Sequence, residues 1–265
     1  MRGRWGDAVA ALVALSLSFG AASAQTLRVT YAISLLGLPL GSGTVKAEIT
    51  PASYEVEGAA KLNALASLVN NSHGVSQGHG AIIAGRISPA AFATTAASSS
   101  STRTIRMAIR NNAVAGVDIS PPFADHPDRV PLRPEDTRNI IDPVSAYVFL
   151  APKSAPEISA ADCDRTLPIF DGYTRFDLKL SFVEKKTVKA RGYEGPVAVC
   201  AVQYQPIAGH RKDRPATKFM AENRDMQIWL APVAGASALA PFKVSIKTMV
   251  GVLDIEATEF AVTGK

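Results

Sequence analysis

Hydrophobic and polar residues alternate along most of this chain, the pattern of strands that have one buried side and one solvent-facing side. From Leu27 to Leu35 every odd position is apolar or aromatic, and Arg28, Thr30 and Ser34 lie between them. The same alternation returns at Ile105 to Ile109, Phe176 to Phe182 and Phe242 to Thr248. The pattern predicts antiparallel strands with one wet face.

Turn residues separate these strands and indicate hairpins. Gly37 to Gly41 contains a proline and two glycines and separates two early strands. Asp171-Gly172 is a hairpin signal between Phe170 and Tyr173, and Gly251 precedes a return strand.

Two short segments show helical signals instead. Leu62 to Val69 places its leucines at helical spacing, and Asp142-Pro143 is a natural cap and first-turn pair for a helix ending near Leu150. We expect both to lie against a sheet. The predicted fold class is therefore all-β, an antiparallel curved sheet or incomplete β-barrel with two short helices.

The segment from Pro121 to Pro143 is rich in proline and has mixed charge. It is either a linker between two domains or a long ordered loop that crosses one sheet. We favour the loop because the composition does not shift across it. The expected organisation is a signal peptide over residues 1–24 and a single β-rich domain over residues 25–265.

The N-terminus has the three parts of an export signal. Arg2 and Arg4 precede an apolar stretch from Ala8 to Phe19, and Ala22-Ser23-Ala24 has the pattern that signal peptidase accepts. The stretch is shorter than the roughly 20 residues that cross a bilayer. We expect cleavage after Ala24, a periplasmic location and no transmembrane segment in the mature chain.

The chain has two cysteines, Cys163 and Cys200. Export to an oxidising compartment favours a disulfide between them, and closing a loop of this length stabilises the fold by about 4 kcal/mol in the chain-entropy model. Two buried free thiols or a redox pair are the alternatives, although a Cys-x-x-Cys motif is lacking. We expect the pair to tie the Asp171-Gly172 hairpin to the strand near Tyr204.

Several short motifs together resemble the domain-of-unknown-function 3108 family. They run in order through nearly all of the mature chain, from about Tyr31 to Phe260, and are Arg129-Val130-Pro131, Asp142-Pro143-Val144-Ser145-Ala146, Cys163 with Arg165 to Gly172, Cys200, Pro206 to His210, Met226 to Pro232, and Gly251. The resemblance implies an exported, β-rich envelope protein. It supplies no catalytic residues.

One motif matches a hydrolase pattern. Gly74-Val75-Ser76-Gln77-Gly78 fits G-x-S-x-G, in which a sharp strand-to-helix turn presents the serine, and His210 is a candidate base. The residues that follow, from His79 to Ile83, indicate a strand. We therefore interpret the motif as a glycine-softened strand and keep a serine hydrolase using Ser76 as the alternative function.

Neither a metal site nor a cofactor site is expected. The four histidines, His73, His79, His126 and His210, lack ligand spacing. His73 and His79 would face the same side of one strand about 20 Å apart, given about 3.3 Å per residue. Asp162 and Asp164 flank Cys163 and are interpreted as turn residues.

A basic cluster is the candidate for binding an anionic ligand. It comprises His210, Arg211, Lys212 and Arg214, although such a charge run is more often simply a solvated loop. The formal net charge of +5 is mild and its residues are spread over many strands, so nucleic acid is not an expected partner.

The sequence thus predicts a non-catalytic periplasmic envelope protein. A curved sheet lined with apolar residues suits an apolar or amphipathic ligand, so a lipid, a glycan or an envelope protein is the expected partner. A purely structural scaffold is the remaining alternative.

Overall fold

The computed structural model describes residues 24–63, 71–151 and 158–264. In this part of the chain the strands form one 14-stranded sheet, and all neighbouring strands pair antiparallel. The strands are β1 (Gln25–Leu35), β2 (Leu38–Ile49), β3 (Ser53–Leu62), β4 (Ser72–Ile83), β5 (Arg86–Ser98), β6 (Thr102–Arg110), β7 (Ala113–Ser120), β8 (Phe149–Leu150), β9 (Arg165–Phe170), β10 (Arg175–Ala190), β11 (Tyr193–Ala208), β12 (Met226–Pro232), β13 (Ala238–Thr248) and β14 (Gly251–Gly264).

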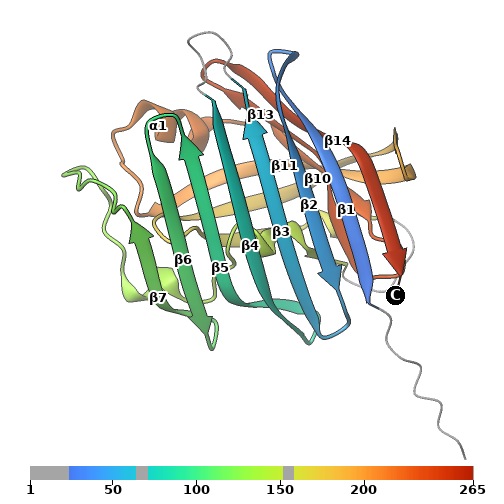
Figure 1. Ribbon diagram of the computed structural model, residues 1–265, viewed down its shortest axis with the longest axis horizontal. Helices are drawn as coiled ribbons and strands as arrows, with labels where there is room; N and C mark the ends of the chain where they lie inside the picture. Colours follow the sequence, from blue (N-terminus) through green and yellow to red (C-terminus); the bar gives the residue numbers. More distant parts are fainter. Residues whose placement is uncertain (1–23, 64–70, 152–157, 265) are drawn as a thin grey trace, which may run out of the picture.

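The sheet is open and folds back on itself. Its spatial order is β7-β6-β5-β4-β3-β2-β1-β14-β13-β12-β11-β10-β9, and β8 pairs with β13 away from this path. Strands β1 to β7 and β14 form a front layer, and the remaining strands cross behind it (Figure 1). The expected all-β fold, an antiparallel curved sheet or incomplete barrel, is confirmed.

The long β10–β11 hairpin helps to fold the sheet back. Its register shifts between Phe182 and Glu184, which marks a bulge, and bulges bend strands. The tip of the hairpin then reaches β14, where the Arg191 amide donates to the Thr258 carbonyl at 3.1 Å and the Phe260 amide donates to Arg191 at 2.8 Å. β13 pairs with β14 only as far as Glu256. The hairpin tip therefore covers part of the second half of β14, near Thr258 and Phe260.

The hydrophobic core lies between the two layers. Alternate residues of β1, including Val29 and Tyr31, point inward and are buried together with Val56, Phe242 and Phe260. Three aromatic rings, those of Tyr193, Phe242 and Phe260, contact one another within it. The face of the front layer that points away from this core is called the outer face below.

A segment without long strands fills the inside of the curved sheet. The Ile141 amide donates to Pro168 at 2.8 Å, the Phe170 amide donates back to Ile141 at 3.0 Å, and Asn139 donates to Asn112 at 2.5 Å. Residues 121–143 therefore hydrogen-bond to strands near both edges of the sheet. Residues 139–150 are called the inner segment.

A buried polar network holds the inner segment in place. The Asp142 carboxylate accepts hydrogen bonds from the amides of Val144 (3.0 Å) and Ser145 (2.8 Å) and from the Ser145 hydroxyl (2.5 Å). The Tyr54 hydroxyl on β3 donates to Ser145 Oγ at 2.7 Å. The Tyr31 hydroxyl lies 2.6 Å from that of Tyr147. Each polar group therefore has a partner, as buried polar groups require.

One predicted helix is not formed, and the other falls mostly outside the described residues. Asp142 to Leu150 forms a short 3-10 turn, η2 (Ser145–Tyr147), and then β8, because Asp142 caps a buried turn rather than an exposed helix. Leu62 ends β3, and residues 64–70 lie outside the described residues. Two further 3-10 turns are η1 (Pro134–Thr137) and η3 (Ala160–Asp162).

The one α-helix in the described part of the chain was not predicted. It is α1 (Pro215–Glu222), which follows Arg214 and has proline in its first turn. The sequence signal was present, because proline favours the first position of a helix. The charge run before it had been interpreted as a loop.

The two cysteines lie at disulfide distance, with sulfur atoms 2.07 Å apart and Cα atoms 5.4 Å apart. Cys163 follows η3 and precedes β9, whereas Cys200 lies in β11, with β10 between these two strands. Both side chains are buried in a cluster with Leu180, Leu230 and Phe149. The pair therefore fixes the last strands of the sheet to one another.

Candidate functional site

Strand register brings polar residues from far apart in the sequence into rows across the outer face. Arg28 of β1 pairs with Lys46 of β2, and Lys46 pairs with Glu57 of β3. The row continues through Gln77 of β4, Ala93 of β5, Arg106 of β6 and Asp118 of β7. This row runs perpendicular to the strands.

A neighbouring row is made largely of hydroxyl-bearing and small side chains. Thr30 pairs with Glu259 of β14 on one side and with Thr44 of β2 on the other. It continues through Ala59, Val75, Thr95 and Thr104. Both rows belong to the face that alternates with the buried core positions.

The two rows enclose a groove of about 770 Å³, called the outer groove. Its outward side chains are Arg28, Thr30, Thr44, Lys46, Glu57, Ala59, Val75, Gln77, Ala93, Thr95, Thr104, Arg106 and Glu259. Short side chains at Ala59 and Ala93 form its floor, whereas longer charged and amide side chains stand around them. The groove is elongated because it follows rows contributed by successive strands.

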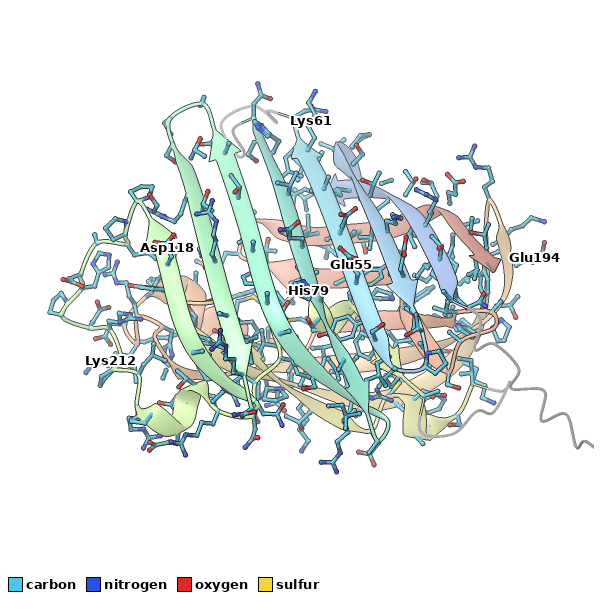
Figure 2. All side chains as sticks on the ribbon, turned by 60° about the horizontal axis from the view of Figure 1, so that its bottom comes forward. Glu55, Lys61, His79, Asp118, Glu194 and Lys212 are labelled. Atoms are coloured by element: carbon cyan, nitrogen blue, oxygen red, sulfur yellow. A yellow bond between two sulfur atoms is a disulfide. The ribbon has the colours of Figure 1, made fainter. Side chains whose placement is uncertain are left out.

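A second hollow of about 520 Å³ continues the outer groove toward β7. The two share Gln77, Ala93 and Arg106, and the second adds His79, Ala91, Ala108, Gly116 and Asp118. Figure 2 labels His79 and Glu55, which pair across β4 and β3, and Asp118 toward the β7 edge. The hollowed surface therefore extends across most of the front layer.

Charges of both signs surround the outer groove. Arg106 Nη1 lies 3.4 Å from Asp118 Oδ2, and Lys46 Nζ lies 2.8 Å from Glu48 Oε1. The hydrogen bond to Glu48 raises the pKa of Lys46, so the lysine stays protonated. Arg28 stands directly opposite Lys46 and has no ion-pair partner within the described ranges. Its guanidinium is therefore a cation available to a ligand.

Such a surface can form many directional hydrogen bonds. Threonine hydroxyls donate and accept, and the Gln77 amide does both through separate atoms. Some of this capacity is already used, since Thr30 Oγ1 donates to Glu259 Oε2 at 3.5 Å. The sequence analysis did not find this site, because one sequence shows which residues face outward but not which strands lie side by side.

Ser76 lies in the middle of β4, not on a strand-to-helix turn. Its hydroxyl is 2.7 Å from Thr94 Oγ1 of the neighbouring strand. Gly78 of the same motif has a packing explanation, because a Cβ there would lie 3.1 Å from Asp142 Oδ1 and 3.2 Å from Val144 Cβ. The motif is thus explained by the approach of the inner segment to β4.

The structure separates most of the histidines. His73 and His79 share the outer face of β4, whereas His126 and His210 lie in loops. Within the described residues, no group of three or more His, Cys, Asp or Glu side chains is placed to hold a metal ion. His210 Nδ1 is buried without a hydrogen-bond partner there, and burial lowers the pKa of this imidazole.

The residues of the predicted basic cluster make different contacts. Arg211 Nε donates to both carboxylate oxygens of Asp128, at 2.9 and 3.2 Å. Desolvation is the largest single influence and raises the pKa of Asp128, but the hydrogen bond and the charge of Arg211, together with smaller contributions, give a net lowering of this pKa. Lys212 is exposed, and Arg214 occupies the position before α1 without a side-chain capping hydrogen bond. Arg211 therefore already has an anionic partner within the chain.

Comparisons with known proteins agree with this fold. The family model "Protein of unknown function (DUF3108)" matches residues 26–258, which confirms the family expected from the sequence motifs. The comparison with curated proteins gave no match. Within the described residues, no helix combines the length and apolar character needed to cross a membrane.

A solved structure shares the architecture. It is a beta-barrel-like protein of the domain of unknown function DUF1849 from Brucella abortus, with a TM-score of 0.50 and 9% sequence identity. The match covers 90% of this chain and 98% of that one. At this identity the likeness concerns the fold alone. The family assignment instead comes from the match over residues 26–258, and this chain belongs to the DUF3108 family of proteins of unknown function.

Proposed function

We propose that this protein is a non-catalytic periplasmic envelope protein that binds an extended glycan along the outer groove. The observation that carries the proposal is the elongated groove of about 770 Å³, with its floor of small side chains and its surround of hydroxyl, amide and charged groups. A function in binding follows from shape and hydrogen-bonding capacity. The fold by itself does not specify it.

The dimensions of the groove support a chain-like ligand. Neighbouring strands lie about 4.8 Å apart, so the groove row from Glu259 on β14 to Thr104 on β6 extends roughly 29 Å. Each strand presents one side chain to this row. A linear polysaccharide laid across the strands would meet about one strand per sugar, because the two repeats are similar in length.

The chemistry of the groove favours a glycan over an apolar ligand. Sugars offer hydroxyl groups that pair with threonine, glutamine and charged side chains, and such groups surround the groove. The inner, concave side instead carries the protein's own apolar clusters, in which Tyr31, Val56 and Phe242 are buried. Arg28 would attract acidic sugars in particular.

A periplasmic location is part of the proposal. It is supported by the export signal expected over residues 1–24, which lie almost entirely outside the described residues, and by the disulfide-distance pair Cys163 and Cys200. Cleavage after Ala24 would leave β1 complete, because this strand begins at Gln25. Cell fractionation with N-terminal sequencing should recover a periplasmic protein that begins at Gln25. Cytosolic protein with an intact Met1 would overturn this part.

We also propose that the protein has no catalytic activity. The alternative, a hydrolase using Ser76, would need an exposed nucleophile on a sharp turn. Ser76 instead lies within β4, hydrogen-bonded to Thr94. This arrangement favours binding over hydrolysis.

Isothermal titration calorimetry with two oligosaccharides tests the glycan proposal. Chitohexaose is neutral and hexagalacturonate is acidic, and we expect the wild type to bind at least one of them. Ala59→Tyr places a large ring on the groove floor at an exposed strand position, where tyrosine is well tolerated. We expect it to weaken binding at least tenfold.

Ala32→Tyr is the matched control, because Ala32 is exposed on the same face of β1 but does not line the groove. It should bind like the wild type. The proposal fails if the wild type binds neither sugar, or if Ala59→Tyr and Ala32→Tyr bind equally well.

A further inference from the structure

Large apolar side chains are exposed at one end of the front layer. Leu36 and Leu38 are 59% and 54% exposed at the turn between β1 and β2. Met249, Val250 and Val252 are 60%, 53% and 40% exposed at the turn between β13 and β14. These five residues are called the apolar tip.

The two turns form one surface. β1 and β14 remain paired up to Leu35 and Leu253, and the Leu36 amide donates to the Val252 carbonyl at 2.9 Å. Gly251 has a φ of 134°, and a Cβ added there would lie 2.2 Å from Leu36 Cδ2. The leucine therefore packs over the neighbouring turn, which places apolar residues of the two turns next to each other.

Turn geometry does not explain the residues of the apolar tip. Leu36 has a φ of 54°, in the left-handed region that favours glycine, asparagine and aspartate. The β6–β7 turn follows this preference, since Asn111 and Asn112 have φ of 51° and 57°, whereas the β4–β5 turn has the small residue Ala84 at a φ of 49°. A leucine at such a position is unfavourable for the backbone and exposes apolar surface. Contact with an apolar partner accounts for the unfavourable backbone position of the leucine and for its exposed apolar surface.

We propose that the apolar tip inserts into the interfacial region of a lipid bilayer. The apolar tip consists of five side chains on two hairpin turns, whereas a stable protein dimer needs about 800 Å² of complementary surface from each partner. Five side chains provide less than that. A bilayer has no fixed shape to match, so a few projecting apolar side chains suffice for reversible binding.

Basic residues next to the apolar tip suit lipid headgroups. Lys247 pairs directly with Val252, and its ammonium lies 2.7 Å from the exposed carboxylate of Asp225. Lys61 is exposed near the same end of β3 (Figure 2). Long lysine side chains can keep their charge at the headgroup level while neighbouring apolar groups insert. The outer groove runs across the strands and is lined by none of the five tip residues, so insertion of the tip would leave it accessible.

Vesicle sedimentation tests this proposal. The full mature protein is mixed with vesicles of phosphatidylcholine and phosphatidylglycerol in equal amounts, and the bound fraction is measured. The test variant is Leu36→Asn with Met249→Ser, in which asparagine suits the positive φ of position 36. We expect the wild type to sediment with vesicles and the variant to bind at least tenfold more weakly.

The control variant is Ile83→Ser. Ile83 is 61% exposed and ends β4, at the end of the front layer opposite to the apolar tip. It therefore matches the tip residues in exposure but lies far from them. It should sediment like the wild type. The proposal is overturned if the wild type does not bind vesicles or if both variants lose binding equally. It is also overturned if the wild type is a dimer that the tip variant dissociates.

Discussion

Asp142 shows how a single buried carboxyl group organises the inside of this molecule. Its side chain has no solvent exposure and accepts three hydrogen bonds from Val144 and Ser145. Burial raises the pKa of the carboxyl, and the hydrogen bonds from Ser145 and Val144 offset part of that rise. The desolvation cost is therefore only partly compensated.

The raised pKa gives Asp142 a pH-dependent effect on stability. The folded state keeps the proton to a higher pH than the unfolded chain does, so this contribution is complete below the ordinary pKa of 3.8 and is lost as pH rises through the folded value. Asp142→Asn does not titrate and should lack this dependence. We expect the difference in Tm, wild type minus variant, to fall from acidic to alkaline pH in thermal melts.

Asp171 does not confound this comparison, although burial also raises its pKa, because it is present in both proteins. A difference in Tm that stays constant, or that grows with pH, would contradict the assignment.

At the level of single residues the sequence predicted the motif around Asp142 but not its burial. Nothing in a local pattern distinguishes a buried turn cap from an exposed helix cap.

At the level of elements, the strands were predictable and the irregular segments were not. Leu27 to Leu35 and Phe242 to Thr248 alternate because one face packs on the core, and both are strands in the structure. The inner segment lies inside the sheet, so its apolar residues, such as Val148 and Phe149, are buried without regular periodicity. Tertiary packing there overrode the local helix signal.

The fit between the inner segment and β4 depends on Gly78. A Cβ at this position would lie 3.1 Å from Asp142 Oδ1, so Gly78→Ala should destabilise the protein by about 1–3 kcal/mol. Gly116→Ala on β7 is the control, because a Cβ there meets no atom within 4 Å. Chemical denaturation should show a change for Gly116→Ala of no more than about 0.5 kcal/mol. Equal effects would refute the packing argument.

The link between Cys163 and Cys200 should stabilise the last strands of the sheet. Replacing both by alanine removes a constraint on the unfolded chain, and we expect a loss of about 2–4 kcal/mol in urea denaturation. With reductant, the stability of the wild type in urea should approach that of the double variant. Reductant should not change the unfolding curve of the double variant. A wild type whose stability is unchanged after verified reduction would contradict this role.

At the level of the whole molecule, the outer groove arises from register and twist. Period-two alternation identifies Arg28, Gln77 and Arg106 as outward-facing residues. It does not show that β1, β4 and β6 belong to one layer or that the layer is hollowed. The basic residues near α1 were visible as a run in the sequence. The groove was not, because its residues come from seven strands.

Native mass spectrometry of protein purified from its own cells tests the central claim, that the outer groove holds a glycan, most directly. We expect the wild type to retain a polar, sugar-containing mass that Ala59→Tyr lacks and Ala32→Tyr keeps. The effect of Ala59→Tyr follows from the position of this alanine on the groove floor. A retained lipid, or a glycan held equally by all three proteins, would contradict the claim.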